Sequence, residues 1–516
     1  MMNDILFGQS YYLKFDPKLW QAMQPYPPLG TLIAASVACE QGYGVALFDA
    51  MLADSPAAWQ AALQQHQPRF AIIYEDSFNY LSKMCLLAMR EAAFTMIEMA
   101  KAAGCTVILC GSDATDHAEA YLQKGADYVL LGEGEETMVE LLAVLDGRSA
   151  TPFSQITGLA YAENGRVQQN PHRPVLTHID DLPRPAWDLV DVEKYRQLWQ
   201  ERHGYYSMNM VTTRGCPYHC NWCAKPIWGQ RYNARSPQAV AAEMRWLQET
   251  YQPDHIWFAD DIMGLKPGWW PEFAAEVQAQ GVHLPFKCLS RADLIVRQPD
   301  NVQALKQANC DIIWLGAESG SQRILDAMEK GTTVEQIREA TQKLQAAGVK
   351  VGFFLQFGYV GETWQDIQKT LQLVWDCLPD DIGISVSYPL PGTQFHERVA
   401  AQLGTQQNWV DSADLAMMYQ GTYTTQFYRQ LHTAVHLEFR ARRGWVKLRP
   451  LLTQPSQWRG SHLYELAAIA YRRLRLPLAR WQLRRLRKSS QANATLLPHM
   501  PLAQSAQPSP QPEETP

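Results

Sequence analysis

The sequence predicts an α/β protein in which a doubly wound parallel sheet is followed by a partial barrel of six βα units and by a helical C-terminal extension. Two observations predict this fold class. Short apolar runs alternate with helical patterns through residues 1–150, and a second series of the same kind runs from about residue 205 to residue 392. The chain of 516 residues is also too long for one hydrophobic core, because single cores stop growing at roughly 250 to 300 residues. We therefore expect two or three domains.

The first series predicts a Rossmann-like domain over residues 1–150. Its parallel strands are expected at Ile5–Phe7, Val45–Phe48, Phe70–Tyr74, Thr106–Cys110 and Tyr128–Leu131. In sheets of this kind, ligands bind beyond the carboxyl ends of the strands. The residues that follow the apolar runs therefore form the expected rim of a pocket: Asp49, Glu75, Gly111, Gly132, Glu133, Gly134 and Glu135.

Residues 151–195 form the expected connection between the two series. A β-hairpin is predicted over residues 156–169, because Asn164-Gly165 is the strongest short signal for a hairpin turn. The segment 182–186 that follows contains two prolines, which stiffen it. We place the domain boundary in this connection.

The second series predicts a partial TIM-type barrel over residues 196–400. Its strands are expected at Met208–Thr213, His255–Ala259, Pro285–Leu289, Ile312–Gly316, Gly352–Phe357 and Ile382–Ser387. In parallel barrels the chemistry gathers at the carboxyl ends of the strands. Unusual residues follow the expected strands here: Cys216, Asp260, Asp261, Arg291, Glu318, Ser319, Gly358 and Tyr388. This coincidence favours one shared site.

The C-terminal part carries a strong local charge. Arg440–Lys488 contains fourteen Lys or Arg and one acidic residue, Glu465, although the whole chain has a formal net charge of −6. We expect residues 401–488 to be helical, and a basic helix with Leu and Trp can lie on anionic lipid. The alternative is a solvated basic face whose leucines pack on the barrel. Residues 489–516 are polar and rich in proline, which predicts a disordered tail.

Composition narrows the protein class. The content of 47% hydrophobic and 19% charged residues is typical of folded globular proteins. The sequence has neither a run of about 18 apolar residues nor an export signal at its start, so we expect a cytoplasmic protein, with peripheral membrane contact through the basic helices as a second expectation. No recognisable RNA-binding module follows the barrel, and nucleic acid is not an expected partner.

Three of the ten cysteines lie within eight residues, in Arg214-Gly-Cys-Pro-Tyr-His-Cys-Asn-Trp-Cys223, directly after a predicted strand. Three thiolates on one loop can hold three irons of a [4Fe–4S] cluster and leave the fourth iron open, whereas an electron carrier normally has four cysteine ligands. An open iron indicates a ligand that reacts. The alternative is a zinc site, which would require four ligands; His219 is nearby, but it lies between two of the cysteines.

This motif resembles that of the radical S-adenosylmethionine superfamily, in which three cysteines are spaced three and two residues apart and an aromatic residue precedes the last. Cys216, Cys220 and Cys223 match the cysteines, and Trp222 matches the aromatic position. The resemblance implies that the open iron binds S-adenosylmethionine, and that one electron cleaves this cofactor to a 5′-deoxyadenosyl radical. It also implies an external electron donor, a flavodoxin or a ferredoxin.

The resemblance extends along the barrel. Asp260 and Asp261 match the segment that contacts the methionine amine in the family, with a solvated acidic strand end as the alternative. Arg291 matches the position that holds the cofactor's carboxylate, and Glu318 with Ser319 matches the ribose contact. A structural ion pair between Arg291 and Glu318 would explain those two residues without a ligand. Gly358–Glu362 and Tyr388–Gly392 match two further family segments, with simple turns as the alternative.

The N-terminal domain resembles that of the cobalamin-binding branch of the same superfamily, which includes the anaerobic magnesium-protoporphyrin monomethyl ester cyclase and several carbon methylases. The match rests on Pro27–Gly30, Asp49-Ala50 and Gly132–Glu136. It implies that Asp49, Gly111, Gly132, Glu133 and Gly134 contact cobalamin. The first 65 residues contain no histidine, and Ser112-Asp113 stands where relatives often have one, so a protein imidazole on cobalt is not expected. The alternative is a domain that binds no corrinoid.

Together these features predict a cobalamin-dependent radical enzyme that methylates or oxidatively cyclises an unactivated carbon of a small, hydrophobic intermediate. Two alternatives remain open. One is a sensor that binds both cofactors without turnover. The other is a radical methylthiotransferase acting on RNA, which would need a second cluster, whereas the cysteines at positions 39, 85, 105 and 110 form no compact triad. No catalytic residue beyond the cofactor contacts is predicted.

Overall fold

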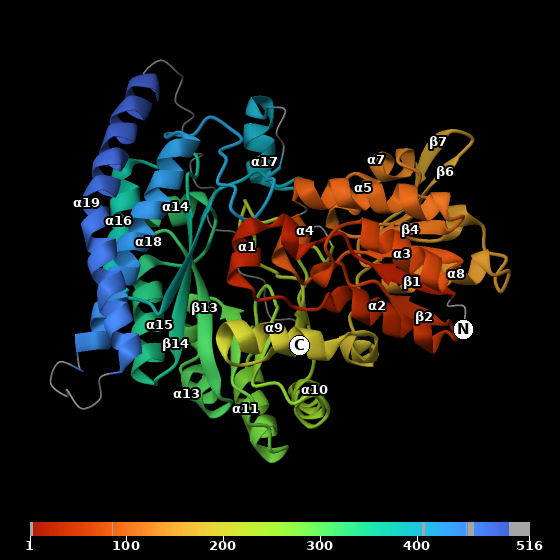
Figure 1. Ribbon diagram of the computed structural model, residues 1–516, viewed down its shortest axis with the longest axis horizontal. Helices are drawn as coiled ribbons and strands as arrows, with labels where there is room; N and C mark the ends of the chain where they lie inside the picture. Colours follow the sequence, from red (N-terminus) through yellow and green to blue (C-terminus); the bar gives the residue numbers. More distant parts are fainter. Residues whose placement is uncertain are drawn as a thin grey trace.

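The computed structural model describes residues 4–84, 86–225, 227–404, 408–449, 451 and 459–494. Figure 1 shows the N-terminal sheet and its helices on one side of the molecule, the barrel on the other, and the long helix α19 (Gly460–Ala494) along the outer edge of the barrel. Two sheets built mainly of parallel strands therefore organise the chain, as the sequence predicts.

The N-terminal sheet confirms the expected doubly wound fold. Its parallel strands are β1 (Ile5–Gly8), β2 (Val45–Leu47), β3 (Phe70–Tyr74), β4 (Thr106–Cys110) and β5 (Tyr128–Leu130), in the order β2-β1-β3-β4-β5. Helices α3 (Ala57–His66) and α5 (Leu87–Ala102) share a core with one face, and α2 (Leu29–Glu40) and α8 (Glu135–Leu145) share a core with the other. The strand order reverses between β1 and β3, which is where such sheets bind ligands.

The expected hairpin forms as β6 (Leu159–Glu163) and β7 (Arg166–Gln169), but it belongs to the first domain. Strand β6 pairs antiparallel with β5 and extends the sheet to seven strands. The boundary that we placed at residue 150 therefore divides a sheet, because the exposed edge of β5 finds its backbone partners in the next segment of chain. Helix α9 (Val192–His203) also crosses the boundary drawn at residue 195.

The second sheet is the expected partial barrel. Its six strands are all parallel, in the order β8-β11-β12-β13-β14-β15: β8 (Ser207–Met210), β11 (His255–Phe258), β12 (Phe286–Ser290), β13 (Cys310–Glu318), β14 (Lys350–Phe357) and β15 (Asp381–Val386). The connecting helices include α10 (Pro237–Thr250), α11 (Trp269–Ala279), α13 (Asp300–Gln307), α15 (Val334–Ala346) and α16 (Trp364–Cys377). A short ribbon of β9 (Thr213–Arg214) and β10 (Asn233–Ala234) encloses the cysteine segment.

The C-terminal region forms two long helices from Thr425 onward, but the described residues 408–424, expected to be helical, form turns. Asp411 and Asp414 accept there from backbone N–H groups two residues further on, which favours turns over helix. Helix α18 (Thr425–Leu448) lies along α19, and both lie beside α16 of the barrel (Figure 1). Helix α19 continues to Ala494, so the first six residues of the tail predicted to be disordered are helical; Ala492 and Ala494 are strong helix formers. Residues 495–516 of that tail lie outside the described residues. No helix among the described residues is both long and apolar enough to span a bilayer.

The two domains pack tightly against each other. The indole Nε1 of Trp199 donates to the carbonyl of Pro25 at 2.7 Å, and the Asn209 amide donates to the carbonyl of Pro27 at 3.0 Å. The hydroxyls of Tyr26 and Ser207 are 2.9 Å apart. The Pro-rich turn before α2 is thereby fixed against the first strand of the barrel.

Candidate functional site

The cysteine loop begins at the carboxyl end of β8, where Asp260 holds it from the neighbouring strand β11. The carboxylate of Asp260 accepts hydrogen bonds from the backbone N–H groups of Thr212 and Thr213 at 2.8 and 2.7 Å, and from their hydroxyls at 2.9 and 3.0 Å. Burial raises the pKa of Asp260 to about 6, although these four donors oppose the shift. With these four donors, Asp260 holds the start of the cysteine loop in position.

The three cysteines of the loop are partly exposed and form no disulfide. The backbone N–H of Tyr218 lowers the pKa of Cys216 against the larger effect of burial, and Nη1 of Arg291 lies 4.0 Å from Sγ of Cys220. Burial raises the pKa of Cys223 to about 12. Bound iron would favour the thiolate form, and N–H donors and cations around the sulfurs suit an anionic cluster.

The end of the loop is anchored by Asn221 and Trp222. The Asn221 side chain donates to the carbonyl of Ala327 at 2.8 Å and accepts from the Tyr359 hydroxyl at 2.9 Å. Trp222 packs against a small apolar cluster that includes Met328 and Phe395. The aromatic residue before the last cysteine therefore fixes the loop to the barrel rim.

Arg291 and Glu318 lie at the carboxyl ends of β12 and β13, but they do not pair with each other. Nε of Arg291 donates to Asp293 at 2.8 Å, and its Nη2 donates to the carbonyl of Lys330 and to the Thr332 hydroxyl at 2.7 and 2.8 Å. The carboxylate of Glu318 instead accepts from Nζ of Lys330 at 2.8 Å. The ion pair that we offered as an alternative is therefore absent, since each residue has its own partner.

Ser319 and Asp261 have different surroundings. Ser319 is fully buried, and its hydroxyl lies 3.1 Å from that of Thr370. Asp261 is partly exposed and pairs with Lys83 of the first domain, with Nζ 2.6 Å from Oδ1. Of the two adjacent aspartates, Asp261 is the one whose carboxylate is accessible.

At the carboxyl edge of the first sheet, the acidic residues are engaged by the protein. Asp49 accepts from the Tyr195 hydroxyl at 2.8 Å, and burial raises its pKa to about 6. Glu75 accepts from the backbone N–H of Ser10 at 3.1 Å, and burial raises its pKa to about 7. Both carboxylates stabilise local structure.

Close packing explains two of the three glycines at this edge, Gly111 and Gly134. A Cβ on Gly111 would lie 2.7 Å from Cβ of Glu75, and a Cβ on Gly134 would lie 2.5 Å from Sγ of Cys110. Gly132 has a φ of +76° and would meet no contact closer than 3.6 Å. The buried hydroxyl of Ser112, just after Gly111, has no partner among the described residues.

Glu133 and Glu135 reach across the domain interface to Arg214. The Arg214 guanidinium contacts Glu133 through Nη1 and Glu135 through Nη2, the latter at 2.8 Å, and all three side chains are at most 5% exposed. Burial alone would lower the pKa of Arg214, but the carboxylates of Glu135 and Glu133 raise it above its usual value. Glu133 also accepts from Nε1 of Trp228 at 3.2 Å.

Arg214 immediately precedes Gly215-Cys216, and it thus joins the cysteine loop to the glycine-rich turn after β5. From the sequence we predict Glu133 at a cofactor rim and no role for Arg214. The one sequence feature that could have indicated a role for Arg214 is its position as a cation beside the cysteines. The sequence does not predict Lys330 and Asp293 as site residues either. Nothing in the local sequence indicates that Lys330 contacts Glu318 or that Asp293 contacts Arg291.

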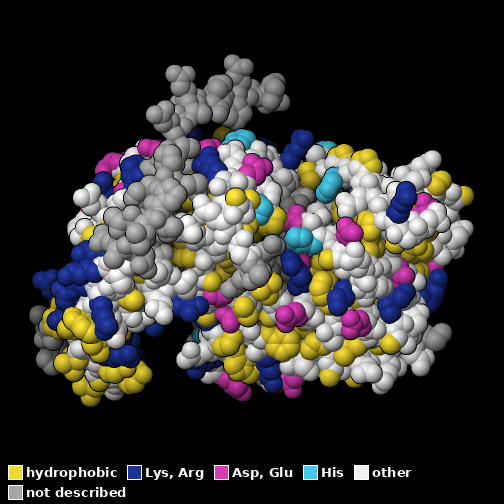
Figure 2. All heavy atoms as spheres, turned by 90° about the horizontal axis from the view of Figure 1, so that it is seen from above, with side chains coloured by type: hydrophobic (Ala, Val, Ile, Leu, Met, Phe, Trp, Pro, Cys, Tyr) yellow, Lys and Arg dark blue, Asp and Glu magenta, His cyan; other side chains and the backbone are white. Residues whose placement is uncertain are grey.

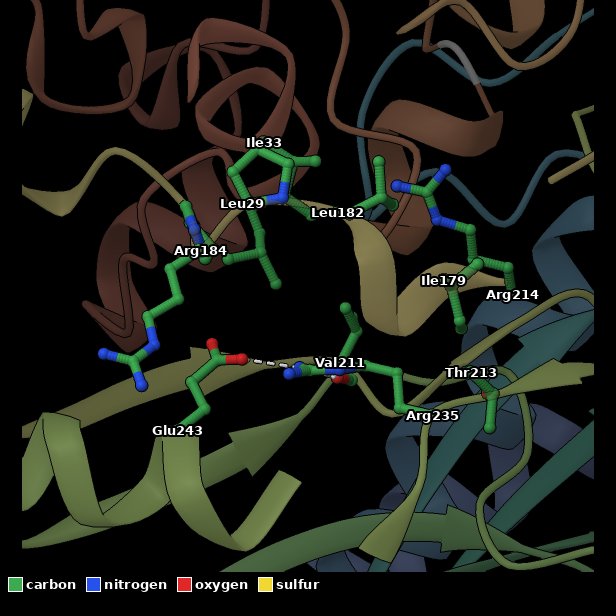
Figure 3. A pocket seen from close by; sticks show the side chains of 12 residues that line it. Leu29, Ile33, Ile179, Leu182, Arg184, Val211, Thr213, Arg214, Arg235 and Glu243 are labelled. Atoms are coloured by element: carbon green, nitrogen blue, oxygen red, sulfur yellow. Dashed lines mark hydrogen bonds and ion pairs between the residues drawn. The ribbon is translucent and has the colours of Figure 1, made fainter. Parts of the chain in front are cut away.

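A hollow lies between the domains beside this contact. Figure 3 shows Leu29 and Ile33 of α2 on one side and Val211, Arg235 and Glu243 on the other, with Arg235 and Glu243 paired at 2.5 Å. The empty space between these side chains is about 450 Å³, a volume that includes the part open to solvent. Thr213 and Arg214 line it, whereas no cysteine is among its described lining residues.

Among the described residues, no three His, Cys, Asp or Glu side chains lie close enough together to hold a single metal ion. The three cysteines do influence one another electrostatically, since Cys216 and Cys220 both act on Cys223. With its N–H donor, its nearby cations and its firm anchoring, the loop fits a cluster that bridges three separated thiolates better than a single ion.

Residues 210–374 match the model of the Radical SAM superfamily. This segment contains the three cysteines and most of the barrel, so it forms a radical SAM domain, and the resemblance drawn from the cysteine motif is confirmed. The matching segment covers about a third of the chain.

Curated relatives match longer parts of the chain than the family model does. A methyltransferase of Pyrococcus horikoshii is 30% identical over 55% of this chain and 60% of its own length, and the anaerobic magnesium-protoporphyrin IX monomethyl ester cyclase of Synechocystis is 27% identical over 62% of each. The chain thus spans about three fifths of the length of these relatives. The hopanoid C-3 methylase of Methylococcus capsulatus is 23% identical over 82% of this chain and 79% of its own. The cyclase and the hopanoid methylase are of the two kinds named in the resemblance.

Two solved structures share the fold. The radical S-adenosylmethionine methyltransferase TsrM of Kitasatospora setae, with cobalamin and a [4Fe–4S] cluster bound, superposes with a TM-score of 0.63 at 17% identity and covers 78% of each chain. The cobalamin-dependent radical enzyme OxsB, with aqua-cobalamin bound, superposes with a TM-score of 0.70 at 16% identity and covers 93% of this chain and 72% of its own. Both domains of the present protein therefore have counterparts in one known architecture.

Proposed function

We propose that this protein is a cobalamin-dependent radical SAM enzyme, which cleaves S-adenosylmethionine reductively to a 5′-deoxyadenosyl radical. The observation that carries the proposal is the cysteine loop at the carboxyl end of the barrel, with three unpaired thiols and with a cation 4.0 Å from one sulfur. Cys216, Cys220 and Cys223 would hold the [4Fe–4S] cluster. When bound, the cluster supplies the electron for the cleavage.

Binding of S-adenosylmethionine is proposed at the ends of β11, β12 and β13. The accessible carboxylate of Asp261 suits the methionine ammonium group, and Arg291 suits a carboxylate. Glu318, held by Lys330, and the adjacent Ser319 stand where ribose contacts are expected. Asp260 contributes by fixing the loop, and Trp222 contributes by anchoring its end.

Cobalamin is proposed at the carboxyl edge of the N-terminal sheet, where it would supply a transferable methyl group or assist an oxidative ring closure. The strand order and the fold shared with TsrM and OxsB support this position. The turns at Gly111, Gly132 and Gly134 and the unpaired hydroxyl of Ser112 are the protein groups available there. Asp49 and Glu133 would act indirectly, since both already hold neighbouring segments in place.

The proposed substrate is a small, hydrophobic biosynthetic intermediate that is methylated or oxidatively cyclised at an unactivated carbon. Relatives that are named as methyltransferases and as a cyclase support these two reaction classes. Electrons would come from a flavodoxin or a ferredoxin in the cytoplasm. A cofactor-binding sensor without turnover and a methylthiotransferase acting on RNA remain the alternatives.

The test is anaerobic reconstitution with iron and sulfide, followed by S-adenosylmethionine, a strong reductant and quantification of 5′-deoxyadenosine. We expect deoxyadenosine from the wild type and none from Cys220→Ala. Cys39→Ala is the matched control, because Cys39 is an exposed cysteine outside the loop and its loss should leave the product unchanged. A wild type that carries the full cluster and still forms no deoxyadenosine would favour the sensor.

Addition of cobalamin to the same preparations tests the second cofactor. The proposal expects one corrinoid bound per chain by absorption spectroscopy, with no dependence on Cys220. Absence of corrinoid binding would contradict the role assigned to the N-terminal domain. The deoxyadenosine measurement would still test the radical cleavage separately.

A further inference from the structure

Helix α19 presents apolar residues on two opposite sides. The side facing α18 buries Ile469, Ala479 and Leu483. The opposite side carries large apolar side chains at spacings of three and four residues, which are Tyr471, Leu474, Leu478 and Trp481. One apolar stripe is enough to hold the helix on the protein, so the second stripe needs another explanation.

The outer stripe is exposed to an unusual degree. Leu474 is 81% exposed, Leu478 and Tyr471 are each 56% exposed, and Trp481 is 52% exposed; Leu463 continues the stripe at 63%. In Figure 2 hydrophobic and basic side chains gather at the edge of the molecule where Figure 1 places α19. Contiguous exposed apolar surface of this kind marks an interaction site.

Cations flank the stripe. Five exposed residues of α19 have no carboxylate partner among the described residues: Arg473, Arg475, Arg484, Arg485 and Lys488. The segment 471–488 contains no acidic residue at all. The guanidiniums of Arg475 and Arg485 lie 5.5 and 5.9 Å from the rings of Tyr471 and Trp481, so charge and aromatic surface occur together.

We propose that the outer face of α19, defined by Leu463, Tyr471, Leu474, Leu478 and Trp481 with its five flanking cations, docks the protein on an anionic lipid bilayer. The apolar stripe would enter the boundary between headgroups and acyl chains, and the arginines would meet the lipid phosphates. Aromatic residues with one polar edge and Arg with an apolar stem suit this boundary.

The charge of the α19 face favours a lipid bilayer over a second copy of the chain, and its apolar stripe favours a bilayer over a nucleic acid. A second copy would bring the same unpaired cations against the stripe, and like charges oppose that pairing. A nucleic acid would satisfy the cations but would leave the Leu474 and Leu478 side chains in water. An anionic bilayer satisfies both kinds of residue. The inference is independent of the proposed enzymatic function, because it rests on surface residues remote from the cysteine loop.

Flotation of the full-length chain with extruded vesicles tests the proposal. The vesicles contain phosphatidylcholine alone or phosphatidylcholine with about 30% phosphatidylglycerol, an anionic lipid. We expect the wild type to float with the anionic vesicles, with at least roughly tenfold weaker partition to neutral ones and a fall in partition as salt is added. Leu474→Ser/Trp481→Ser and Arg484→Gln/Arg485→Gln should each reduce partition by about tenfold or more.

Two matched controls lie elsewhere on the surface. Trp20→Ser removes an exposed Trp of α1 (Pro17–Ala22), and Arg245→Gln removes an exposed Arg of α10; neither should change partition. The proposal fails if the wild type does not float with anionic vesicles, or if the α19 variants float like the controls. It also fails if light scattering shows a dimer that Leu474→Ser/Trp481→Ser dissociates, or if the chain binds an RNA of random sequence and does not float with the anionic vesicles.

Discussion

Arg214 stands two residues before Cys216, and its guanidinium lies between two buried carboxylates of the other domain. A buried charge network of this kind tolerates loss of one member poorly, because the remaining charges stay buried without a partner. The site and the domain interface therefore share one residue.

We expect Arg214→Met to destabilise the folded protein by about 3–5 kcal/mol, because Glu133 and Glu135 would lose their cation. The measurement is the shift of the denaturant midpoint followed by circular dichroism. Arg245→Met, which breaks an exposed pair with Glu249, should cost no more than about 1 kcal/mol. The triple variant Arg214→Met/Glu133→Gln/Glu135→Gln should recover part of the loss, and equal midpoints for both single variants would contradict the argument.

Glu362 gives a pH-dependent prediction. Its Oε2 accepts from the backbone N–H of Gly358 at 2.7 Å, its side chain is fully buried, and burial raises its pKa from 4.5 to about 8. The folded chain therefore binds this proton more tightly than the unfolded chain. The stability that the proton contributes is complete below about pH 4.5 and is lost as the pH rises through about 8.

Replacement of this group should flatten the pH profile. We expect the free energy of unfolding, measured by denaturant titration, to fall less for Glu362→Gln than for the wild type between pH 5 and pH 8. The two falls should differ by on the order of a few kcal/mol. Glu119→Gln, at an exposed position of α7 (Ala118–Gln123), serves as the control. Parallel profiles for Glu362→Gln and the wild type would show that the carboxyl is not protonated in the folded protein.

At the scale of elements, the end of β11 sets the position of the loop that follows β8. The four hydrogen bonds to Asp260 come from two consecutive residues, so they fix both the direction of the chain and its height above the barrel. The adjacent strand thereby places Cys216 relative to Arg291 at the end of β12.

Asp260→Asn keeps the shape of the side chain but offers one acceptor oxygen in place of two. Oδ1 accepts both backbone N–H groups, so the amide nitrogen would replace Oδ2, to which the Thr212 hydroxyl donates. That bond and the negative charge on the acceptor would be lost, and the loop should be held less firmly. We expect the affinity of the apoprotein for iron during reconstitution to fall by roughly tenfold. Iron and sulfide analysis at limiting iron measures this, with Asp261→Asn as the neighbouring control, whose iron content should match the wild type.

At the scale of the whole molecule, the domain interface is extensive and polar as well as apolar. It includes the Arg214 network, the Lys83 pair with Asp261, and the contacts of Trp199 and Asn209 with the turn before α2. An interface with buried charge pairs couples the folding of the parts that it joins.

We therefore predict that the two domains unfold together. Thermal unfolding followed by far-ultraviolet circular dichroism and by calorimetry should give coincident transitions for the wild type. Arg214→Met should separate them, with the N-terminal domain and the barrel melting at different temperatures. Two well-separated transitions in the wild type would show that the interface contributes little to stability.

The sequence alone determined the layered architecture and the cysteine site. Continuous apolar runs predicted all five parallel strands of the first sheet and all six strands of the barrel to within a few residues. This was possible because strands that are buried on both faces have continuous apolar sequences. The spacing of Cys216, Cys220 and Cys223 is local chemistry, so it needed no tertiary information.

Tertiary structure decided what the polar residues do. Asp49, Glu133 and Asp260 stand at strand ends like ligand contacts, yet each is satisfied by a group from elsewhere in the chain: Tyr195, Arg214 and the Thr212–Thr213 backbone. The partners of Arg291 and Glu318 likewise depend on Lys330, which lies on a later connection. A carboxylate at a strand end has the same local pattern whether it binds a ligand or a distant side chain. Only the folded chain shows which partner reaches it, because burial without a partner is too costly to persist.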